Sequence, residues 1–272
     1  MLNSSLYSDK YVDDQAEKFR NRKKNHFANH IRLAKNLVTN YGIAPPGTIL
    51  DIGCSIGTFA IEFALDGYCS IGLDLDPKAL SCGRILSEKE GCKPEWICSD
   101  AGDFKLKKKV DMVICFDLLE HLDDKTIAKM FECIRKNLKQ DGVFVFHTFP
   151  TQFDHLFYRN AIACLPLLLF RKLSHKSFEK IVNWYAKLLD SYFFLRYGKV
   201  HKDIIKNTVH PNPLSPDRVK KFLNSAGFEI LSFEMGLDEI NPLKSGQGFL
   251  AKKYLSHQPA VLRSIWGVAR NP

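Results

Sequence analysis

The 272-residue chain is long enough for one large domain, and its 45% apolar and 25% charged residues favour a folded core over disorder. No stretch reaches the roughly 18 to 20 apolar residues that a membrane-spanning helix needs. The formal net charge of +9, with basic runs at Arg20–Lys24 and Lys105–Lys109, favours an anionic partner, although solvated surface lysines account for it equally well. The eight cysteines form no C-x-x-C pair and the N-terminus is polar, so we expect a reduced, cytoplasmic protein without a zinc or redox motif.

The first half of the chain predicts a parallel sheet with helices on both faces. A polar, partly mobile segment is expected over residues 1–29, followed by a helix over His30–Tyr41 that Pro45-Pro46-Gly47 ends. Short β-rich runs then alternate with helical patterns through residues 30–150. The expected strands are Thr48–Ile52, Ser70–Leu75, Glu95–Ser99, Val110–Phe116 and Val143–Phe149, and the expected helices are Thr58–Leu65, Pro77–Glu90 and Thr126–Leu138.

Residues 151–206 interrupt this alternation and predict a helical, aromatic insertion. Seven apolar residues of this segment fall on one helical face: Phe178, Ile181, Trp184, Tyr185, Leu188, Leu189 and Tyr192. The sheet pattern resumes over residues 207–256, with a helix from Pro216 to before Gly227 and strands at Phe228–Phe233 and Gly248–Tyr254. Residues 257–272 are assigned to a C-terminal tail.

The most informative motif runs from Asp51 to Gly57, where a strand gives way to a helix. Glycine permits positive φ and close approach of a ligand, so Gly53 and Gly57 are expected to leave room for a cofactor. Asp51 is expected to orient the turn or attract an ammonium group. The loop is neither G-x-G-x-x-G nor a phosphate-binding loop with its Lys-Ser/Thr, so both phosphate cradles are disfavoured.

Two further acids follow the next two strands. Asp74 is placed to accept from ribose hydroxyls, and Asp100 could accept from an adenine amino group. Because the carboxyl ends of parallel strands meet at one edge of a sheet, Asp51, Asp74 and Asp100 are expected to point to one crevice.

With these motifs the sequence resembles the class I S-adenosylmethionine-dependent methyltransferases. Asp51–Gly57 is similar to their D-x-G-x-x-x-G motif, Asp74 to their ribose-binding acid and Asp100 to their adenine-site acid. The resemblance implies a Rossmann-like α/β/α sandwich whose seven strands are ordered 3-2-1-4-5-7-6 with the seventh antiparallel, and S-adenosylmethionine as cofactor. The expected cofactor-binding residues are Asp51, Gly53, Cys54, Gly57, Asp74, Leu75, Asp100, Ala101 and Phe116.

The segment Asp117–Leu122 is where this family places groups that face the methyl donor. Asp117, Glu120 and His121 could share a face of a helical turn, and His121 is a candidate base or a packing residue. The pattern resembles the acid-x-x-Glu-His motif of ubiquinone-pathway O-methyltransferases and of metal-dependent small-RNA 2′-O-methyltransferases, with His210 as the downstream histidine. Asp117 stands where glutamate is usual, which puts metal binding in doubt, and we assign no metal. His147, at a strand end, is interpreted as bonded to a loop.

The leading hypothesis is O-methylation of a small-molecule, lipid or glycan acceptor, with Asp117, Glu120, His121 and His210 as candidate catalytic residues. The aromatic insertion is interpreted as a lid over an apolar acceptor, as core packing, or as a peripheral membrane contact through residues 161–176. RNA methylation and a non-catalytic binding protein of the same fold are the alternatives, and nucleic acid is the less favoured partner.

Overall fold

The computed structural model describes residues 8–24, 27–149, 151, 165–170, 172–197, 210–236 and 264–272. Its strands are β1 (Thr48–Ile52), β2 (Cys69–Asp74), β3 (Glu95–Cys98), β4 (Val110–Phe116), β5 (Leu138–Thr148), β6 (Glu229–Gly236) and β7 (Ser264–Arg270). Its α-helices are α1 (Asp9–Arg20), α2 (Phe27–Asn40), α3 (Thr58–Leu65), α4 (Pro77–Glu90), α5 (Asp124–Asn137), α7 (His175–Tyr197) and α9 (Pro216–Ser225). Two 3₁₀ helices are η2 (Leu119–His121) and η4 (Leu165–Phe170).

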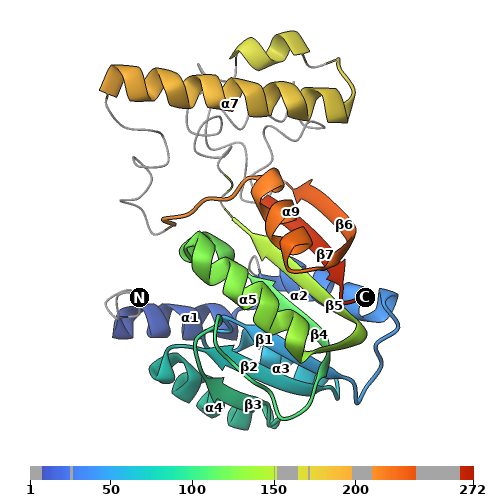
Figure 1. Cartoon of the computed structure of the whole chain (residues 1–272). Helices are drawn as coiled ribbons and strands as arrows, with labels where there is room; N and C mark the ends of the chain where they lie inside the picture. Colours follow the sequence, from blue (N-terminus) through green and yellow to red (C-terminus); the bar gives the residue numbers. More distant parts are fainter. Residues whose placement is uncertain are drawn as a thin grey trace.

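The strands form one sheet in the order β3-β2-β1-β4-β5-β7-β6, as expected (Figure 1). Parallel pairing joins β1 to β2 and β4, β2 to β3, and β4 to β5, whereas β7 is antiparallel to both β5 and β6. The continuous apolar composition of β4 suits its central place, because a strand between two helical layers is buried on both faces. The predicted fold class is therefore confirmed.

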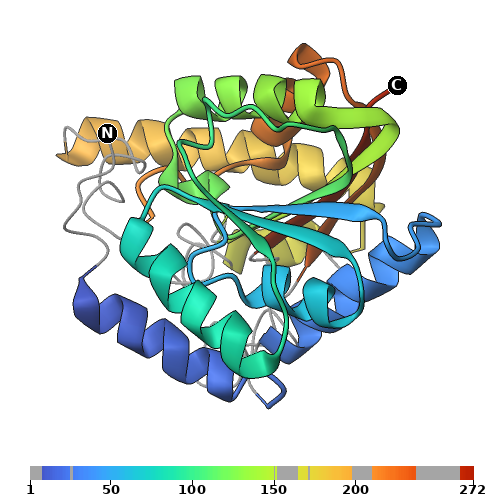
Figure 2. The same ribbon diagram turned by 90° about the horizontal axis from the view of Figure 1, so that it is seen from below.

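Helices cover both faces of the sheet, which gives three layers (Figure 2). On one face α5 and α9 bury the larger core, which includes Ile127, Phe131 and Leu223. On the other face α2, α3 and α4 pack on the sheet, and α1 packs against α4. In both layers the helices carry apolar residues at helical spacing on the side that faces the sheet. Burial of this apolar surface is the main force that holds each helix in place.

The N-terminal segment contains a helix that the polar composition concealed. Ser8 caps α1 by accepting a hydrogen bond from the Tyr11 N–H, and the helix buries Ala16 and Phe19. Only these narrow apolar contacts distinguish its sequence from a solvated coil. The expectation of a mobile segment is therefore wrong over residues 9–20.

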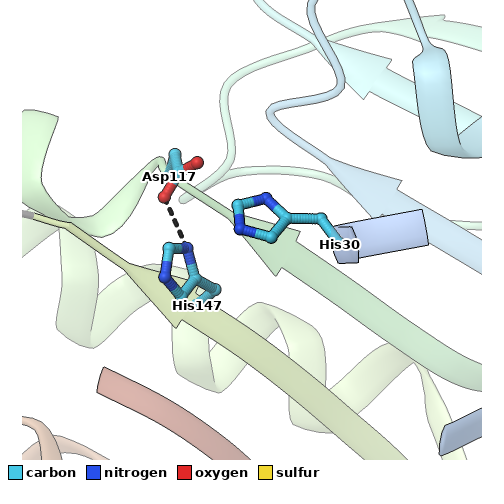
Figure 3. Close-up of side chains that lie close together, drawn as sticks. All are labelled: His30, Asp117 and His147. Carbon is cyan, nitrogen blue, oxygen red and sulfur yellow. Dashed lines mark hydrogen bonds and ion pairs between the residues drawn. The ribbon is translucent and has the colours of Figure 1, made fainter. Parts of the chain in front are cut away.

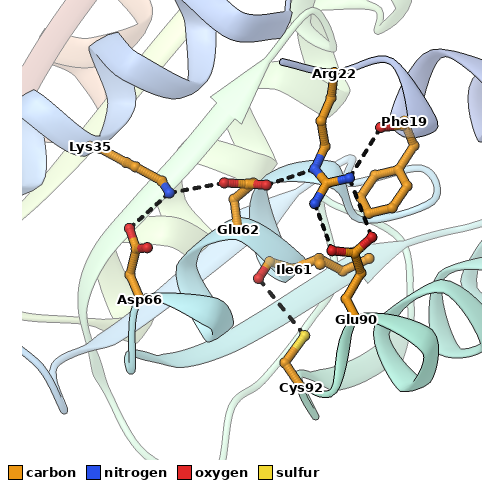
Figure 4. Close-up of polar contacts among 8 residues, drawn as sticks. All are labelled: Phe19, Arg22, Lys35, Ile61, Glu62, Asp66, Glu90 and Cys92. Carbon is orange, nitrogen blue, oxygen red and sulfur yellow. Dashed lines mark hydrogen bonds and ion pairs between the residues drawn. The ribbon is translucent and has the colours of Figure 1, made fainter.

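A buried network of charges attaches the N-terminal helices to α3 and α4 (Figure 4). Arg22, only 6% exposed, donates from Nε to Glu62 Oε1 (2.6 Å) and from Nη2 to Glu90 Oε2 (2.9 Å). Lys35 Nζ contacts the other Glu62 oxygen at 2.9 Å. Burial alone would raise the pKa of Glu62, but hydrogen bonds from Arg22 and Lys35 outweigh it and lower the pKa. Part of the basic run Arg20–Lys24 thus has a structural role.

The seventh strand lies in the segment that we had assigned to a tail. The strand predicted at Gly248–Tyr254 lies outside the described residues, whereas β7 occupies Ser264–Arg270. Gly267 lowers the local strand propensity, so the local sequence does not indicate a strand here. The glycine is required, because a Cβ at Gly267 would lie 2.0 Å from the ring of Phe146 on the neighbouring strand. Packing against β5 therefore selects a residue that local propensity disfavours.

Helical structure is present in the described parts of the segment 151–206, as predicted. Phe178 of α7 and Leu167 of η4 are buried, but most of the predicted aromatic face is not. Trp184, Tyr192 and Leu188 are 62%, 55% and 46% exposed. Among the described residues no helix has both the length and the apolarity needed to cross a membrane.

Gly267→Ala tests the packing that selects β7. We expect the substitution to lower the free energy of unfolding by at least about 1–3 kcal/mol, the usual cost of overfilling a packed core, measured by urea denaturation. Phe146→Leu in the same background should recover part of the loss, because leucine frees the space of the ring. Gly102→Ala is the matched control, since the nearest atom to its Cβ would be Asp100 Oδ1, at 3.2 Å. A Gly267→Ala protein as stable as the wild type would contradict this packing.

Candidate active site

The loop between β1 and α3 is held against β2 by its own backbone. The N–H groups of Gly53 and Cys54 donate to the Leu73 carbonyl at 2.8 and 3.1 Å. Gly53 and Gly57 both adopt positive φ, at 71° and 76°, which glycine does without a Cβ clash. Gly57 is the N-cap residue of α3. The turn predicted from the sequence is thus confirmed.

Side chains of the protein occupy the space beside these glycines. A Cβ on Gly57 would lie 2.2 Å from the Trp96 ring of β3, and one on Gly53 would lie 2.8 Å from the Leu118 side chain. A Cβ on Gly72 or Gly83 would also lie too close to the ring of Trp96, at 2.8 and 2.7 Å. The missing side chain of Gly57 therefore makes room for Trp96, and the cofactor role assigned to Gly57 stays a prediction.

Asp51 places a buried carboxylate at the carboxyl end of β1. The residue is 3% exposed, and its Oδ2 atom has no hydrogen-bond partner among the described residues. Burial raises the pKa of Asp51 to about 8, with added repulsion from Asp74 and against a hydrogen bond from the Ala60 backbone. A cationic group at this oxygen would replace the missing partner.

Asp74 joins two loops of the sheet edge. Its Oδ2 accepts from the Ser55 N–H at 2.7 Å and its Oδ1 accepts from the Asp76 N–H at 2.9 Å. Burial raises its pKa although these hydrogen bonds oppose the shift. Each carboxylate oxygen has a second lone pair, so the predicted ribose contact stays open to it.

The predicted adenine side of the site is more exposed. Leu75 is 48% exposed, and Asp100 is exposed with its Oδ1 accepting from the Gly102 N–H at 2.7 Å. Ala101 packs against the larger core. The cofactor roles assigned to Leu75, Asp100 and Ala101 stay predictions.

A cavity of about 1490 Å³ lies beside the loop and extends under α1 and α2. The predicted site residues that line it are Asp51, Gly53, Cys54, Phe116, Asp117, Glu120, His121 and His210. Gly57, Asp74, Leu75, Asp100 and Ala101 are outside the lining. The cavity therefore unites the start of the cofactor loop with all four candidate catalytic residues.

Those four residues form two separate clusters. Asp117 has a left-handed backbone, with φ of 54°, and its Oδ1 is hydrogen-bonded to His147 Nδ1 at 2.6 Å. His30 of α2 faces the same pair (Figure 3). The interpretation of His147 as bonded to a loop is confirmed, and its partner is a predicted site residue. The expected common face of Asp117 with Glu120 and His121 is not formed.

Glu120, His121 and His210 form the second cluster. Glu120 is fully buried, and its Oε2 accepts from Thr148 Oγ1 at 2.8 Å. Its Oε1 lies 4.0 Å from His121 Nε2, and the His121 and His210 rings are 5.0 Å apart. Burial, together with repulsion from Asp117, raises the pKa of Glu120 to about 8.

Tyr11, His30 and Trp266 also line this cavity, although the sequence patterns do not mark them as site residues. Tyr11 and Trp266 come from segments that had been assigned to a mobile terminus and a tail. His30 belongs to an expected helix, and helical spacing alone does not distinguish a site residue from a core residue. Only the capping signal at Ser8 could have indicated that Tyr11 is on a helix.

Comparisons with known proteins relate this site to methyl transfer. Residues 49–142 match the family model described as a methyltransferase domain. A protein of Geobacillus sp. (strain WCH70) named as a methyltransferase is 24% identical over 78% of this chain and 87% of its own length. The ubiquinone biosynthesis O-methyltransferase of Rickettsia prowazekii is 26% identical, over 45% of this chain and 49% of its own length, so the match spans about half of that relative.

Solved structures share the fold over almost the whole chain. A magnesium protoporphyrin IX methyltransferase from Synechocystis, with S-adenosylhomocysteine bound, has a TM-score of 0.57 at 14% identity and covers 99% of this chain and 100% of its own. An S-adenosylmethionine-dependent methyltransferase from Clostridium acetobutylicum has the same TM-score at 12% identity, covering 96% and 98%. These likenesses show the fold, and the matched family model shows a methyltransferase domain over residues 49–142.

Proposed function

We propose that this enzyme methylates an oxygen atom of a small-molecule or lipid-linked acceptor. The observation that carries the proposal is that one cavity contains both the start of the cofactor loop and a cluster of proton-accepting side chains, Glu120, His121 and His210. Methyl transfer to a hydroxyl requires that the acceptor be aligned and that its proton be removed. This cavity contains groups for both tasks.

The residues at the loop fit S-adenosylmethionine, whose sulfonium supplies an activated methyl group. Asp51 Oδ2 is a buried oxygen that lines the cavity and lacks a hydrogen-bond partner among the described residues. It would pair with the α-ammonium group. Asp74 holds the loop backbone in place and would accept from the ribose.

His121 is the residue that we assign as base. Its side chain is 23% exposed and lines the cavity, and its Nε2 lies 4.0 Å from Glu120 Oε1. A histidine accepts a proton near neutral pH, and the neighbouring Glu120 side chain stabilises the resulting imidazolium when it is ionised. His210, 5.0 Å away between ring centroids, lies where it would orient the acceptor.

The acid-x-x-Glu-His pattern also implies a divalent metal at these residues. Three of its members, Glu120, His121 and His210, have ligand atoms within 4.8 Å of one another. The fourth, Asp117, is hydrogen-bonded to His147 and belongs to the other cluster. The four-residue set is therefore incomplete, and we assign no step of the reaction to a metal there.

Aromatic side chains in the wall of the cavity support a ring-containing or lipid-linked acceptor. Phe27, Phe59, Phe116, Phe149 and Trp266 line the cavity. Within the proposed membrane contact at residues 161–176, the described helix η4 exposes Leu169 by 83% and Leu165 by 50%, with Lys172 exposed beside it. Apolar side chains flanked by basic ones suit an anionic lipid surface, where a lipid-linked acceptor would be found.

Asp74→Ala tests the cofactor site. Removing the carboxylate leaves the Ser55 and Asp76 N–H groups without their acceptor and removes the ribose contact, so affinity for S-adenosylhomocysteine should fall more than tenfold by calorimetry. Asp103→Asn, at an exposed acid, is the control and should bind like the wild type. Undetectable binding by the wild type would favour the non-catalytic alternative.

Asp51→Asn tests whether the pKa of the buried Asp51 carboxyl is raised in the protein without cofactor. The Asp51 carboxyl loses its proton near pH 3.8 when unfolded and near pH 8 when folded, so its contribution to stability falls as the pH rises between these values. Each pKa unit corresponds to about 1.4 kcal/mol. The stability of the variant relative to wild type should therefore increase by roughly 1–4 kcal/mol between pH 5 and pH 8, in urea titrations. Parallel pH profiles of the two proteins would show that Asp51 is not perturbed.

The acceptor class is tested by methyl uptake. Radiolabelled S-adenosylmethionine should label the organic-soluble fraction when the enzyme is given a panel of catechols with and without polyprenyl tails, and should not label tRNA. For any acceptor found, His121→Ala should lower kcat about 10²–10⁴-fold while the affinity for S-adenosylhomocysteine stays near wild type. Labelling of tRNA alone would reverse the acceptor assignment, and equal loss of turnover and affinity would make His121 a packing residue.

A further inference from the structure

Three side chains from separate elements meet in the wall of the cavity. His30 comes from α2, Asp117 from the turn after β4, and His147 from β5 (Figure 3). His147 Nδ1 and Asp117 Oδ1 are 2.6 Å apart, and the His30 and His147 rings are 5.0 Å apart between centroids. One ligand atom from each of the three residues lies within 4.8 Å of the others.

Aromatic packing fixes the two imidazoles. The Trp266 ring of β7 lies 4.1 Å from the His147 ring at a tilt of 38°, and 5.3 Å from the His30 ring in an edge-on contact. Phe116 makes edge contacts with both histidines, each at 6.3 Å. Orientation by surrounding groups is what a preformed ligand set requires.

The cluster is closed on the protein side and open to the cavity. His147 is 1% exposed, His30 is half-buried, and the Asp117 side chain is 44% exposed. All three residues line the cavity. An ion could therefore enter from the cavity and keep a coordination position that faces it.

We propose that His30, Asp117 and His147 bind a divalent transition-metal ion, with Zn²⁺ as the best match. Two imidazole nitrogens and one carboxylate oxygen are a donor set that Zn²⁺ accepts, and a site with three protein ligands leaves the fourth position for water or substrate. Ligand bonds of about 2.0–2.2 Å place neighbouring donor atoms roughly 3.4 Å apart. The ligand atoms lie within 4.8 Å of one another, so metal binding requires only a small adjustment in which Asp117 exchanges its hydrogen bond with His147 for a metal bond.

The ion has a function only if the proposed O-methylation holds. Its open position faces the cavity that contains the cofactor loop, where an acceptor oxygen would bind. A bound Zn²⁺ lowers the pKa of an oxygen ligand and so prepares a hydroxyl for methylation. Metal binding itself depends on the three side chains and not on the identity of the acceptor.

The second cluster is less suited to take up an ion from solution. Glu120 is fully buried, and one of its oxygens is occupied by the Thr148 hydroxyl. Asp117 is more accessible, and its cluster contains two histidines that are oriented by the same tryptophan. Direct comparison of variants in the two clusters decides between them.

The test is metal binding by tag-free, chelator-treated, full-length protein. Co²⁺ is titrated with the d–d absorption bands as the signal, and Zn²⁺ by calorimetry. We expect one equivalent of tightly bound metal, and an affinity at least 100-fold lower in His30→Ala and in Asp117→Asn. His121→Ala and His210→Ala are the matched controls and should keep wild-type affinity.

Two outcomes would overturn the proposal. One is the absence of saturable metal binding by the wild type, and the other is loss of binding in the His121 and His210 variants with retention in the His30 variant. Binding of S-adenosylhomocysteine is measured on every variant as the check of folding. Because that measurement is independent, a protein that binds the cofactor product but no metal contradicts the metal site alone. If buried His147→Ala does not fold, half-buried His30→Ala still provides the test.

Discussion

The active site depends on the burial of carboxylates at the carboxyl edge of a parallel sheet. Asp74 satisfies its charge by accepting from two loop N–H groups, and in doing so it sets the positions of the loops after β1 and β2. Asp51 has no such compensation at Oδ2 among the described residues, and its pKa is raised to about 8. A negative charge that is buried without a partner is unfavourable, and pairing with a cation removes this cost. In the proposed complex, the ammonium group of the sulfonium cofactor would supply that positive charge.

The N-terminal helices α1 and α2 form one wall of the cavity, and ion pairs hold them in place. Arg22 is buried between Glu62 of α3 and Glu90 of α4, so three elements are joined through one guanidinium. A buried ion pair contributes little net stability by itself, but its geometry permits few alternatives. As a result, α1 and α2 place Tyr11 and His30 in the wall of the cavity at the edge of the sheet.

The acid-x-x-Glu-His motif shows how backbone conformation divides residues that are close in sequence. Helical spacing would place Asp117, Glu120 and His121 on one face, but only Leu119–His121 form a helical turn. Asp117 precedes that turn with positive φ, and its side chain meets His147 of the adjacent strand. Two histidine and carboxylate clusters therefore replace the single one expected, each containing one acid of the motif.

Trp96 and Phe146 show that the sequence can mark a glycine without revealing which side chain requires it. The sequence marks Gly57 as part of a tight turn, yet the ring that requires its missing Cβ belongs to β3, about 40 residues later. Gly267 made a true strand look like a tail, because the ring that requires it is on β5. In both cases the constraint is a contact between strands that no local window contains.

By itself the amino-acid sequence determined the core elements from β1 to β4, within a residue at each end, because apolar runs, helix caps and prolines act through neighbouring residues. It also determined the cofactor loop, since a glycine turn between a strand and a helix is a local pattern. Only the tertiary structure decided the partner of Asp117, the place of β7 and the union of His30 with His147. Those depend on side chains far apart in the chain, and packing brings them together only when the sheet and both helical layers have formed.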